Sequence, residues 1–373
     1  MRIERIELRT IRMELVHPFE TSFGTESARH AIIVRIDGEG LTGYGECVAG
    51  LGPWYSYETV GTSLHILREY LAPRLVGQDV RSPEEVGGHF SCVRGHPMAK
   101  AGLEFAVWDL LAQAAGQPLA RVLGGRRDRV DSGVSIGIQP SLDALLERID
   151  GFLAQGYRRV KLKIKPGWDV GVATAVRERF PDVPLMVDAN SAYGLEDLDV
   201  FRRLDGLGLL MIEQPLSYDD IYEHSKLQAR LETPLCLDES IHTARDARWA
   251  LEIGSCGVIN IKPGRVGGLV EARKIHDLCE DRGVPVWCGG MLETGIGRAH
   301  NVALATLPNF RLPGDLSASD RYYARDLVDP PFALNPDGTL PVPSGPGIGV
   351  SVNHELLDRF TVGVESIASK GFG

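Results

Sequence analysis

The chain has 373 residues, enough for one barrel-sized domain and a smaller companion. Hydrophobic residues make up 43% and charged residues 24%, which excludes an intrinsically disordered chain. The formal net charge of −10 disfavours nucleic acid and anionic membranes as partners, and no apolar stretch reaches the roughly 18 residues of a membrane span. The N-terminal segment has no signal-peptide core, so we expect a cytoplasmic protein.

Several common ligand-binding motifs are missing from the sequence. The six cysteines include no CxxC pair, which predicts buried, reduced thiols rather than disulfides or a zinc site. The ten histidines form no HExxH pair, and neither a GxxxxGK[ST] loop nor a GxGxxG fingerprint occurs. These absences exclude a zinc protease, a P-loop nucleotide-binding protein and a Rossmann dehydrogenase.

Residues 1–125 are predicted to form an α+β domain. We expect strands at 3–16, 31–37 and 41–48, followed by helices at 59–71 and 100–115. The segment 17–27 is apolar at its tip and contains Gly24, which is typical of a lid loop and equally of an ordinary surface connection. The Pro- and Gly-rich tail, residues 325–373, is expected to return to this domain.

Residues 126–324 alternate short apolar strands with helical patterns. Strands are expected at 133–138, 159–164, 185–188, 209–213, 235–238, 258–262, 286–288 and 310–313. Eight such units with right-handed crossovers are enough to close a (β/α) barrel of the TIM type, so the fold class is α/β. A doubly wound open sheet is the alternative, but it normally carries a glycine-rich ligand turn that this sequence lacks.

Charged residues end the predicted barrel strands at a regular spacing. Lys163, Asp188, Glu213 and Asp238 are each 25 residues apart, and Lys262 follows 24 residues later. Because the carboxyl ends of barrel strands form one face, we expect these five side chains to converge. A single acid at a strand end is commonly a helix cap, but five charged residues in phase indicate a site.

The three carboxylates in this series predict a metal site. Asp188, Glu213 and Asp238 offer only oxygen ligands, a set typical of Mg²⁺, with Mn²⁺ as a natural substitute. Without a cation, their mutual repulsion would raise the pKa of at least one of them. Asn190 and Glu239 are candidates to orient the ligands, although Asn190 suits a helix cap equally well.

The lysines predict acid–base chemistry. Lys161 and Lys163 lie two apart and therefore share the inward face of one strand, while Lys262 ends the strand opposite in an eight-stranded barrel. Such amines on two sides of an α-carbon can remove and return its proton, and a metal ion stabilises the enediolate that forms. Neighbouring cations should lower the pKa of a lysine toward the working range. We expect Lys161 to help hold the substrate carboxylate.

The series Lys-x-Lys, Asp, Glu, Asp and Lys resembles the enolase superfamily over nearly the whole chain. This resemblance implies a modified TIM-type barrel with an α+β capping domain built from the N-terminal region and the C-terminal tail. Members similar to mandelate racemase carry a histidine base near the seventh strand, whereas residues 288–297 here contain none. Lys262 therefore takes that side, as in the branch that resembles muconate lactonizing enzyme.

Within this branch the chain resembles o-succinylbenzoate synthases and N-acylamino acid (N-succinylamino acid) racemases. The motifs that carry the resemblance are residues 160–163 (VKLK), 188–190 (DAN), 212–215 (IEQP), 238–240 (DES), 260–268 (NIKPGRVGG) and 289–295 (GGMLETG). Dipeptide epimerases hold a substrate ammonium with an Asp-x-Asp at the eighth strand, where residues 314–317 (GDLS) supply one acid. An uncharged, acylated nitrogen is thus the better expectation, with dipeptide epimerase and muconate cycloisomerase as alternatives.

The resemblance also implies which residues act. Lys163 and Lys262 would exchange the α-proton in racemisation, or one of them would drive a syn dehydration in the synthase reaction. The implied contacts to the distal part of the substrate are Ser135, Gly290, Met291, Phe19, Phe23 and Tyr55. Arg265 is expected to tune Lys262. Lid packing for the two phenylalanines, a strand-end hydrogen bond for Ser135 and a surface position for Arg265 are the alternatives.

Two further functions stay open at this point. A barrel lysine can form a Schiff base in an aldolase, and a barrel can serve as a non-catalytic binding scaffold. Mere binding needs no lysine on both sides of a ligand, which argues against the scaffold. The resemblance implies a homo-oligomer, plausibly an octamer, and is compatible with menaquinone synthesis, with amino-acid conversion, or with both.

Overall fold

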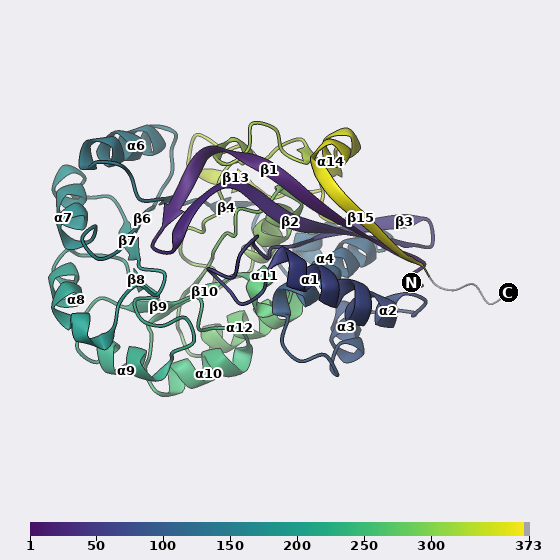
Figure 1. The fold of residues 1–373 in the computed structure, drawn as a ribbon, viewed down its shortest axis with the longest axis horizontal. Coiled ribbons are helices and arrows are strands. Elements are labelled where there is room, and N and C mark those ends of the chain that lie inside the picture. Colours follow the sequence, from purple (N-terminus) through teal and green to yellow (C-terminus); the bar gives the residue numbers. More distant parts are fainter. Residues whose placement is uncertain (369–373) are drawn as a thin grey trace.

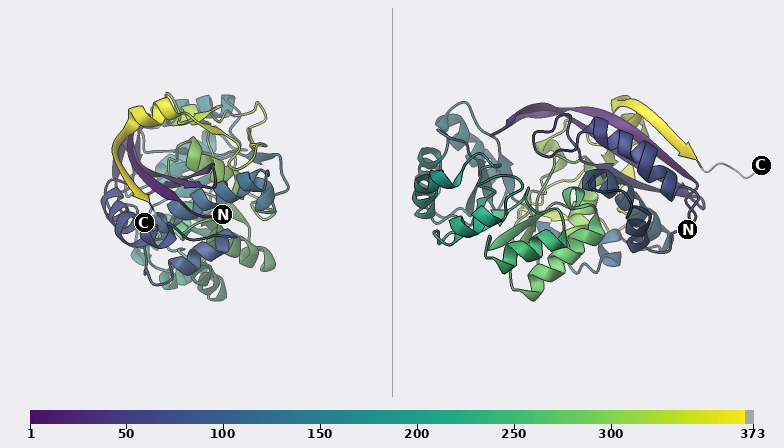
Figure 2. Two further views of the ribbon diagram at one scale, coloured as in Figure 1. Left: turned by 90° about the vertical axis from the view of Figure 1, so that its right-hand side faces the viewer. Right: turned by 60° about the horizontal axis from the view of Figure 1, so that its bottom comes forward.

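The computed structural model describes residues 1–368, which form two main sheets (Figure 1). One sheet is antiparallel with the strand order β15-β1-β2-β3, and the other is parallel with seven strands. The antiparallel strands are β1 (Arg5–Thr21), β2 (Gly24–Gly38), β3 (Leu41–Cys47) and β15 (Thr361–Ala368). Because β15 pairs with β1, the end of the described chain returns to the N-terminal sheet, as expected for the tail (Figure 2).

Helices of the N-terminal region cover this sheet. They are α1 (Val60–Ile66), the π-helical turn η1 (Leu67–Leu71), α2 (Ala72–Leu75), α3 (Pro83–His89) and α4 (Pro97–Ala114). The helix α4 lies directly on β3 because two glycines of that strand leave room for its backbone. A Cβ atom at Gly43 would lie 2.1 Å from the carbonyl oxygen of Ala106, and one at Gly45 would lie 2.2 Å from that of Gly102. The domain therefore depends on glycine at both positions.

The segment predicted as a lid loop is the tip of a long hairpin. β1 continues to Thr21 and β2 begins at Gly24, because the antiparallel pairing resumes with Phe19 opposite Glu26. The loop conformation expected for residues 17–27 is therefore wrong. The tip lies against the barrel: the amide of Ile138 donates to the carbonyl oxygen of Glu20 at 2.9 Å.

The parallel sheet has the order β11-β10-β9-β8-β7-β6-β5 and confirms seven of the eight predicted barrel strands. These strands are β5 (Val134–Ile136), β6 (Val160–Lys163), β7 (Leu185–Asp188), β8 (Ile212–Glu213), β9 (Leu235–Leu237), β10 (Val258–Ile261) and β11 (Val286–Cys288). Their side chains are buried on both faces, as in other sheets enclosed by helices.

The eighth expected strand, residues 310–313, is not a regular strand. Phe310 forms a single parallel bridge with Val286, and Gly314 forms another with Ser132. The segment thus joins the two edges of the seven-stranded sheet, but Pro313 has no amide hydrogen for a continuous ladder. The fold is a modified barrel that is closed on this side by isolated bridges.

Helices pack around the outside of the barrel (Figure 1), and several of them bury only one face. They are α6 (Leu142–Ala154), α7 (Val170–Arg179), α8 (Leu198–Asp205), α9 (Tyr222–Gln228), α10 (Ala244–Glu252), α11 (Pro263–Val266), α12 (Leu269–Asp281) and α13 (Gly295–Leu304). In α8, for example, Phe201 and Leu204 are buried, and Arg202 and Arg203 between them are exposed.

The remaining elements are short. They are α5 (Leu119–Val122), β4 (Arg129–Asp131), η2 (Leu195–Asp197), η3 (Ser319–Arg321), β12 (Val328–Asp329), β13 (Thr339–Pro341), β14 (Ser351–Val352) and α14 (His354–Phe360). The domain boundaries at residues 125/126 and 324/325 stay a prediction, and residues 369–373 of the predicted tail lie outside the described part. None of the helices within residues 1–368 has the length and apolarity needed to cross a membrane.

All six cysteines are free, as expected. Five of them are buried, whereas Cys92 is exposed, so the expectation of buried thiols is wrong at that position. Cys92 follows α3 in a turn at the surface, where a short polar segment provides no core for it.

Candidate active site

Three carboxylates meet at the carboxyl ends of neighbouring strands. Asp188 and Glu213 end β7 and β8, where their Cα atoms are paired across the sheet, and Asp238 follows directly after β9. All three side chains are 0% exposed. The regular spacing seen in the sequence therefore corresponds to one buried acidic site.

Lysine ammonium groups neutralise two of these carboxylates. Nζ of Lys163 lies 2.7 Å from Oδ2 of Asp188, and Nζ of Lys161 lies 3.1 Å from the same atom. Lys161 also lies 2.9 Å from Oε2 of Glu213, whose other oxygen accepts from Nδ2 of Asn260 at 2.7 Å. The two lysines of β6 thus share one inward face, as the strand alternation predicts.

The third carboxylate lies on the opposite side of the site. Nζ of Lys262 is 2.7 Å from Oδ2 of Asp238, and the guanidinium of Arg265 is in direct contact with Oδ1. The phenolic hydroxyl of Tyr55 donates to Oδ1 of Asp238 at 3.2 Å. Arg265 is 2% exposed and also donates to the carbonyl oxygen of Ile241, so the alternative of a surface arginine is wrong.

The donor set fits a hard divalent cation. It consists of three fully buried carboxylates without a cysteine or histidine, and hard divalent cations prefer such oxygen ligands. Burial and the charge of Asp188 raise the pKa of Glu213. Burial also raises the pKa of Glu239 to about 7, and its Oε2 has no hydrogen-bond partner within residues 1–368. The site is thus rich in acceptor oxygens, as a cation site requires.

Within residues 1–368, one other group of metal-ligating side chains clusters more tightly than these carboxylates. The ligand atoms of His276, Asp277 and Glu280 on α12 all lie within 4.8 Å of one another, and the three site carboxylates do not form such a group. Nε2 of His276 accepts from the amide of Asn309 at 2.9 Å, and Nδ1 lies 2.8 Å from Asp277. Because both ring nitrogens already have partners, this cluster is a helix-surface contact rather than a metal site.

The two candidate catalytic lysines differ in their pKa. Burial lowers the pKa of Lys163, Asp188 partly offsets this effect, and the like charge of Lys161 adds to it. The pKa of Lys262 is raised, because Tyr55 and Glu239 outweigh the opposing effect of burial. The pKa of Lys163 therefore moves in the expected direction, chiefly through burial, whereas that of Lys262 moves in the opposite direction because acidic groups surround it.

Asp315 completes the acidic site, and the sequence analysis assigned it no role there. Its Oδ2 lies 2.6 Å from Nζ of Lys161, and its Oδ1 lies 2.8 Å from Nη1 of the buried Arg159. Although burial opposes ionisation, these two cations lower the pKa of Asp315 to about 2. The available signals for this pair were the position of Arg159 at the start of a predicted strand and the single acid at the eighth strand.

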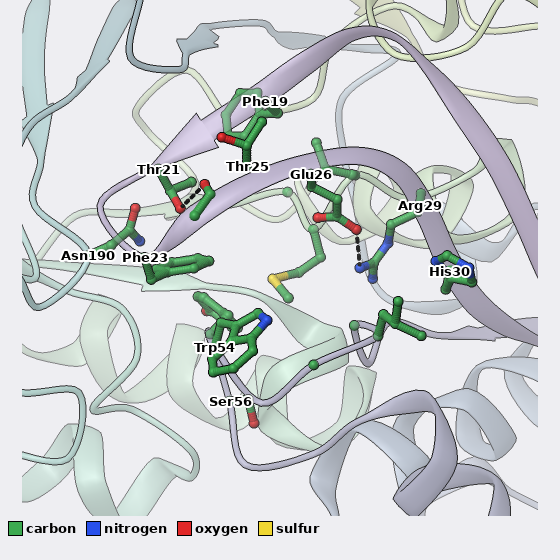
Figure 3. A pocket seen from close by; sticks show the side chains of 18 of the residues that line it. Phe19, Thr21, Phe23, Thr25, Glu26, Arg29, His30, Trp54, Ser56 and Asn190 are labelled. Carbon is green, nitrogen blue, oxygen red and sulfur yellow. Dashed lines mark hydrogen bonds and ion pairs between the residues drawn. The ribbon is translucent and has the colours of Figure 1, made fainter.

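A cavity of about 880 Å³ opens above these groups, between the barrel and the N-terminal hairpin (Figure 3). Lys163 and Lys262 both line it. Every residue predicted to contact substrate also lines it, as does Asn190; the predicted contacts are Phe19, Phe23, Tyr55, Ser135, Lys161, Gly290 and Met291. The hairpin and the barrel therefore enclose one common site.

Asn190 and Ser135 are two polar side chains that line this cavity, and they differ in their hydrogen bonds. Oδ1 of Asn190 accepts from Lys163 at 2.6 Å, and its Nδ2 donates to Glu239 at 2.9 Å. Asn190 is therefore part of the site rather than a helix cap. The buried hydroxyl of Ser135 has no partner in the described part of the chain, so the strand-end hydrogen bond considered as its alternative role is absent there.

Several lining residues were missed by the sequence analysis. They include Glu26 and Arg29 on the hairpin and Leu51 and Trp54 in the loop after β3. Leu51 and Trp54 are 67% and 71% exposed, which is unusual for large apolar side chains. The Gly-, Pro- and aromatic-rich segment 50–57 was the available signal, but an irregular loop has no periodicity that would reveal its direction.

The fold and the site together define a capped β/α barrel whose lysines and buried carboxylates suit metal-assisted proton transfer. Comparison with known proteins identifies the family. Residues 5–124 match the mandelate racemase / muconate lactonizing enzyme N-terminal domain, and residues 144–356 match the enolase C-terminal domain-like family. The chain belongs to the enolase superfamily.

Relatives match along nearly the whole chain. An o-succinylbenzoate synthase from Geobacillus kaustophilus is 55% identical over 360 residues, which cover 96% of each chain. An N-succinylamino acid racemase from an Amycolatopsis species is 51% identical and covers 97% of this chain and 98% of its own. A solved enolase superfamily member from Listeria innocua has a TM-score of 0.95 at 43% identity, with 99% of each chain covered.

Proposed function

We propose that this protein removes the proton α to a carboxylate and acts as an o-succinylbenzoate synthase, an N-succinylamino acid racemase, or both. The single observation that carries the proposal is the placement of Lys163 and Lys262. They project from β6 and from the end of β10, with three strands between them, into the same cavity. One relative named for each of these activities matches more than nine-tenths of the chain.

In racemisation the two lysines act from opposite faces of the α-carbon. Because its pKa is lowered, Lys163 loses its proton more readily than an ordinary lysine, and as the neutral amine it takes the α-proton and becomes an ammonium. The raised pKa of Lys262 favours its ammonium, which delivers a proton to the other face. The two lysines have then exchanged protonation states, so the reverse sequence serves the other stereoisomer.

Asp188, Glu213 and Asp238 would hold Mg²⁺, and Mn²⁺ can substitute for it because it prefers the same ligands. When bound, the ion supplies positive charge that stabilises the negative charge developing on the substrate carboxylate. Lys161 contributes further positive charge at this point through its contacts with Asp188 and Glu213. Arg265 and Glu239 position the groups around Asp238 and Asn190.

In the synthase reaction one lysine serves twice. The neutral amine takes the α-proton, the adjacent C–O bond breaks, and the same ammonium returns the proton to the departing hydroxyl, so water leaves from the same face. The amine is neutral again at the end. The other lysine remains an ammonium and stabilises the negative charge on the opposite face.

The state of Asp315 supports an acylated substrate over a dipeptide. An epimerase that binds a free α-ammonium needs an available carboxylate at this end of the barrel. Asp315 is 7% exposed and is already paired with Arg159 and Lys161. Its charge is therefore neutralised, and an uncharged N-acyl group is the better match. Dipeptide epimerase and muconate cycloisomerase activities remain the alternatives within the family.

Proton NMR in D₂O tests the proposal. The α-proton signal of an N-succinylamino acid is expected to disappear with enzyme and Mg²⁺, and the synthase substrate is expected to lose water. Comparing kcat/KM for the two substrates then identifies the preferred reaction. Binding without deuterium incorporation across a panel of N-succinylamino acids would instead support a non-catalytic binding barrel.

An aldolase requires a separate test. Borohydride reduction in the presence of a ketone substrate should leave Lys163 and Lys262 unmodified, and EDTA should abolish activity. Covalent trapping at either lysine together with full activity in EDTA would establish the Schiff-base mechanism instead.

The proposal also covers the oligomeric state and the cellular location of the protein. We expect a homo-oligomer, with an octamer as the implied number, that works in the cytoplasm on a small carboxylate. Light scattering on the purified chain measures the oligomer directly. The metabolic role is menaquinone synthesis, amino-acid conversion, or both. The comparison of kcat/KM for the synthase substrate and the N-succinylamino acid distinguishes these roles.

A further inference from the structure

We infer that Arg29 binds a second carboxylate, located at the distal end of the substrate's acyl arm. This inference rests on the proposed function and adds a specificity-determining residue to it. Arg29 lies on β2 in the N-terminal hairpin, is 3% exposed and lines the same cavity as the two catalytic lysines. It therefore places a buried positive charge beside the bound substrate.

The guanidinium of Arg29 is poorly satisfied within the chain. Nη2 donates to the carbonyl oxygen of Val48, and Nη1 lies 3.5 Å from Oε1 of Glu26, a distance too long for a good hydrogen bond. Nε is buried and has no partner within residues 1–368. A guanidinium has five N–H donors, and a buried charge of this kind is stable only when it is paired.

The charges of two other carboxylates act on Arg29, but both groups are hydrogen-bonded elsewhere. Glu46 accepts from the hydroxyl of Thr294 at 2.7 Å, and Glu293 accepts from the amide of Met291 at 2.8 Å. Both therefore contribute a favourable field without pairing directly with the guanidinium. Glu26 is the remaining acidic neighbour, and its side chain is 36% exposed. Since it can turn toward solvent, an incoming carboxylate can take its place.

Arg29 lies on the opposite side of the cavity from Asn190. Figure 3 shows Asn190 at one side of the cavity and Arg29 with His30 at the other. Asn190 accepts a hydrogen bond from Lys163 and so marks the side of the cavity on which that lysine lies. Large apolar side chains, including Phe23 and Trp54, line the cavity as well. The cavity thus fits a ligand with a carboxylate at each end and apolar groups beside it.

This charge distribution matches a succinyl arm. In both an o-succinylbenzoate precursor and an N-succinylamino acid, the succinyl group carries a free carboxylate remote from the reacting carbon. Arg12 and His30, which are paired across the hairpin, also line the cavity; Arg12 forms an ion pair with Glu14 at 2.6 Å, and burial lowers the pKa of His30, so Arg29 is the main positive charge here. Arg29 gives this chain a physical reason to prefer the charged arm over a neutral acyl group of equal size.

The test measures α-deuterium exchange in D₂O for two compounds. One is N-succinylphenylalanine, and the other is its analogue in which the distal carboxylate is replaced by a carboxamide. We expect wild type to favour the carboxylate about 10- to 100-fold in kcat/KM, mainly through KM. Arg29→Met should remove this preference by lowering only the carboxylate value. Glu26→Gln, which deletes a competing carboxylate at a half-exposed position, should increase the preference several-fold. Arg35→Met, on the same strand but away from the cavity, should retain the wild-type ratio.

Each outcome is decisive. Equal kcat/KM values of wild type for the two compounds would overturn the inference. An equal fall of the two kcat/KM values in Arg29→Met would do the same. Either result would leave the proposed function intact, because the α-proton still exchanges. Exchange of neither compound by wild type would overturn the proposed function itself. If Arg29→Met does not fold, the wild-type ratio and the opposite shift in Glu26→Gln still decide the matter.

Discussion

The phenolic oxygen of Tyr55 accepts a hydrogen bond from the ammonium of Lys262 at 3.0 Å, although 207 positions separate the two residues in the chain. Tyr55 belongs to the loop after β3, whereas Lys262 follows β10 of the barrel. The same hydroxyl donates to Asp238. The N-terminal region therefore holds a lysine and a carboxylate of the barrel in place as well as covering them.

Tyr55→Phe is expected to lower kcat about 10-fold. The change removes a hydrogen bond to a charged group, and the ring that lies 4.4 Å from Nζ of Lys262 remains. Racemisation rates measured by circular dichroism check this result. Tyr57→Phe, at a half-exposed neighbour outside the cavity, serves as the matched control and should retain wild-type activity. Equal activities of the two variants would contradict this role of Tyr55.

Asp188→Asn and Asp238→Asn are expected to weaken Mg²⁺ binding and to reduce turnover by at least about 1,000-fold. Each substitution keeps the size of the side chain and removes the negative charge that a hard cation requires. Titration calorimetry with Mg²⁺ measures binding, and thermal unfolding checks that the fold persists. Undiminished activity of either variant in metal-free buffer would refute the metal assignment.

Replacement of either catalytic lysine should restrict α-proton exchange to one of the two stereoisomers. Lys163→Met and Lys262→Met should each abolish racemisation, because one face of the α-carbon loses its proton donor and acceptor. Each variant should still exchange the α-proton of one stereoisomer, and the two variants should act on opposite stereoisomers. Lys165→Met, at a partly exposed lysine paired with Glu20, is the control. Undiminished exchange of both stereoisomers in either catalytic-lysine variant would exclude the two-lysine mechanism.

Glu46→Gln is expected to remove part of the pH dependence of stability. Burial raises the pKa of Glu46 to about 7, against about 4.5 when it is exposed. Between these values the folded state binds more protons than the unfolded state, so the free energy of unfolding falls as pH rises and levels off above pH 7. The expected loss is about 3 kcal/mol.

Urea unfolding of wild type and Glu46→Gln between pH 4 and pH 8 measures this difference. Burial also raises the pKa of Glu104 to about 7 and that of Asp109 to about 6. These two groups are present in both proteins and therefore change the free energy of unfolding of both by the same amount. The difference between the two curves therefore isolates Glu46. Parallel curves would show that Glu46 does not titrate in this range.

Much of the barrel and of its chemistry is readable from the sequence. Strand alternation places Lys161 and Lys163 on one face, and the 25-residue spacing of charged strand ends brings Asp188 and Glu213 together, because every βα unit repeats the same rise and crossover. Both are periodic properties of the chain. They need no knowledge of distant contacts, and seven of the eight expected strands follow from the same regularity.

Other features depend on contacts between distant segments, which no local pattern encodes. Only the folded chain shows that Asp315 is neutralised by Lys161 and Arg159, and that Pro313 interrupts the last strand. Likewise, the irregular loop after β3 and the long hairpin acquire their direction by packing on the barrel. Sequence periodicity determined the barrel and its reactive groups. Tertiary packing decided the pKa values of these groups and the residues that line the cavity. Both depend on side chains brought together from separate parts of the chain.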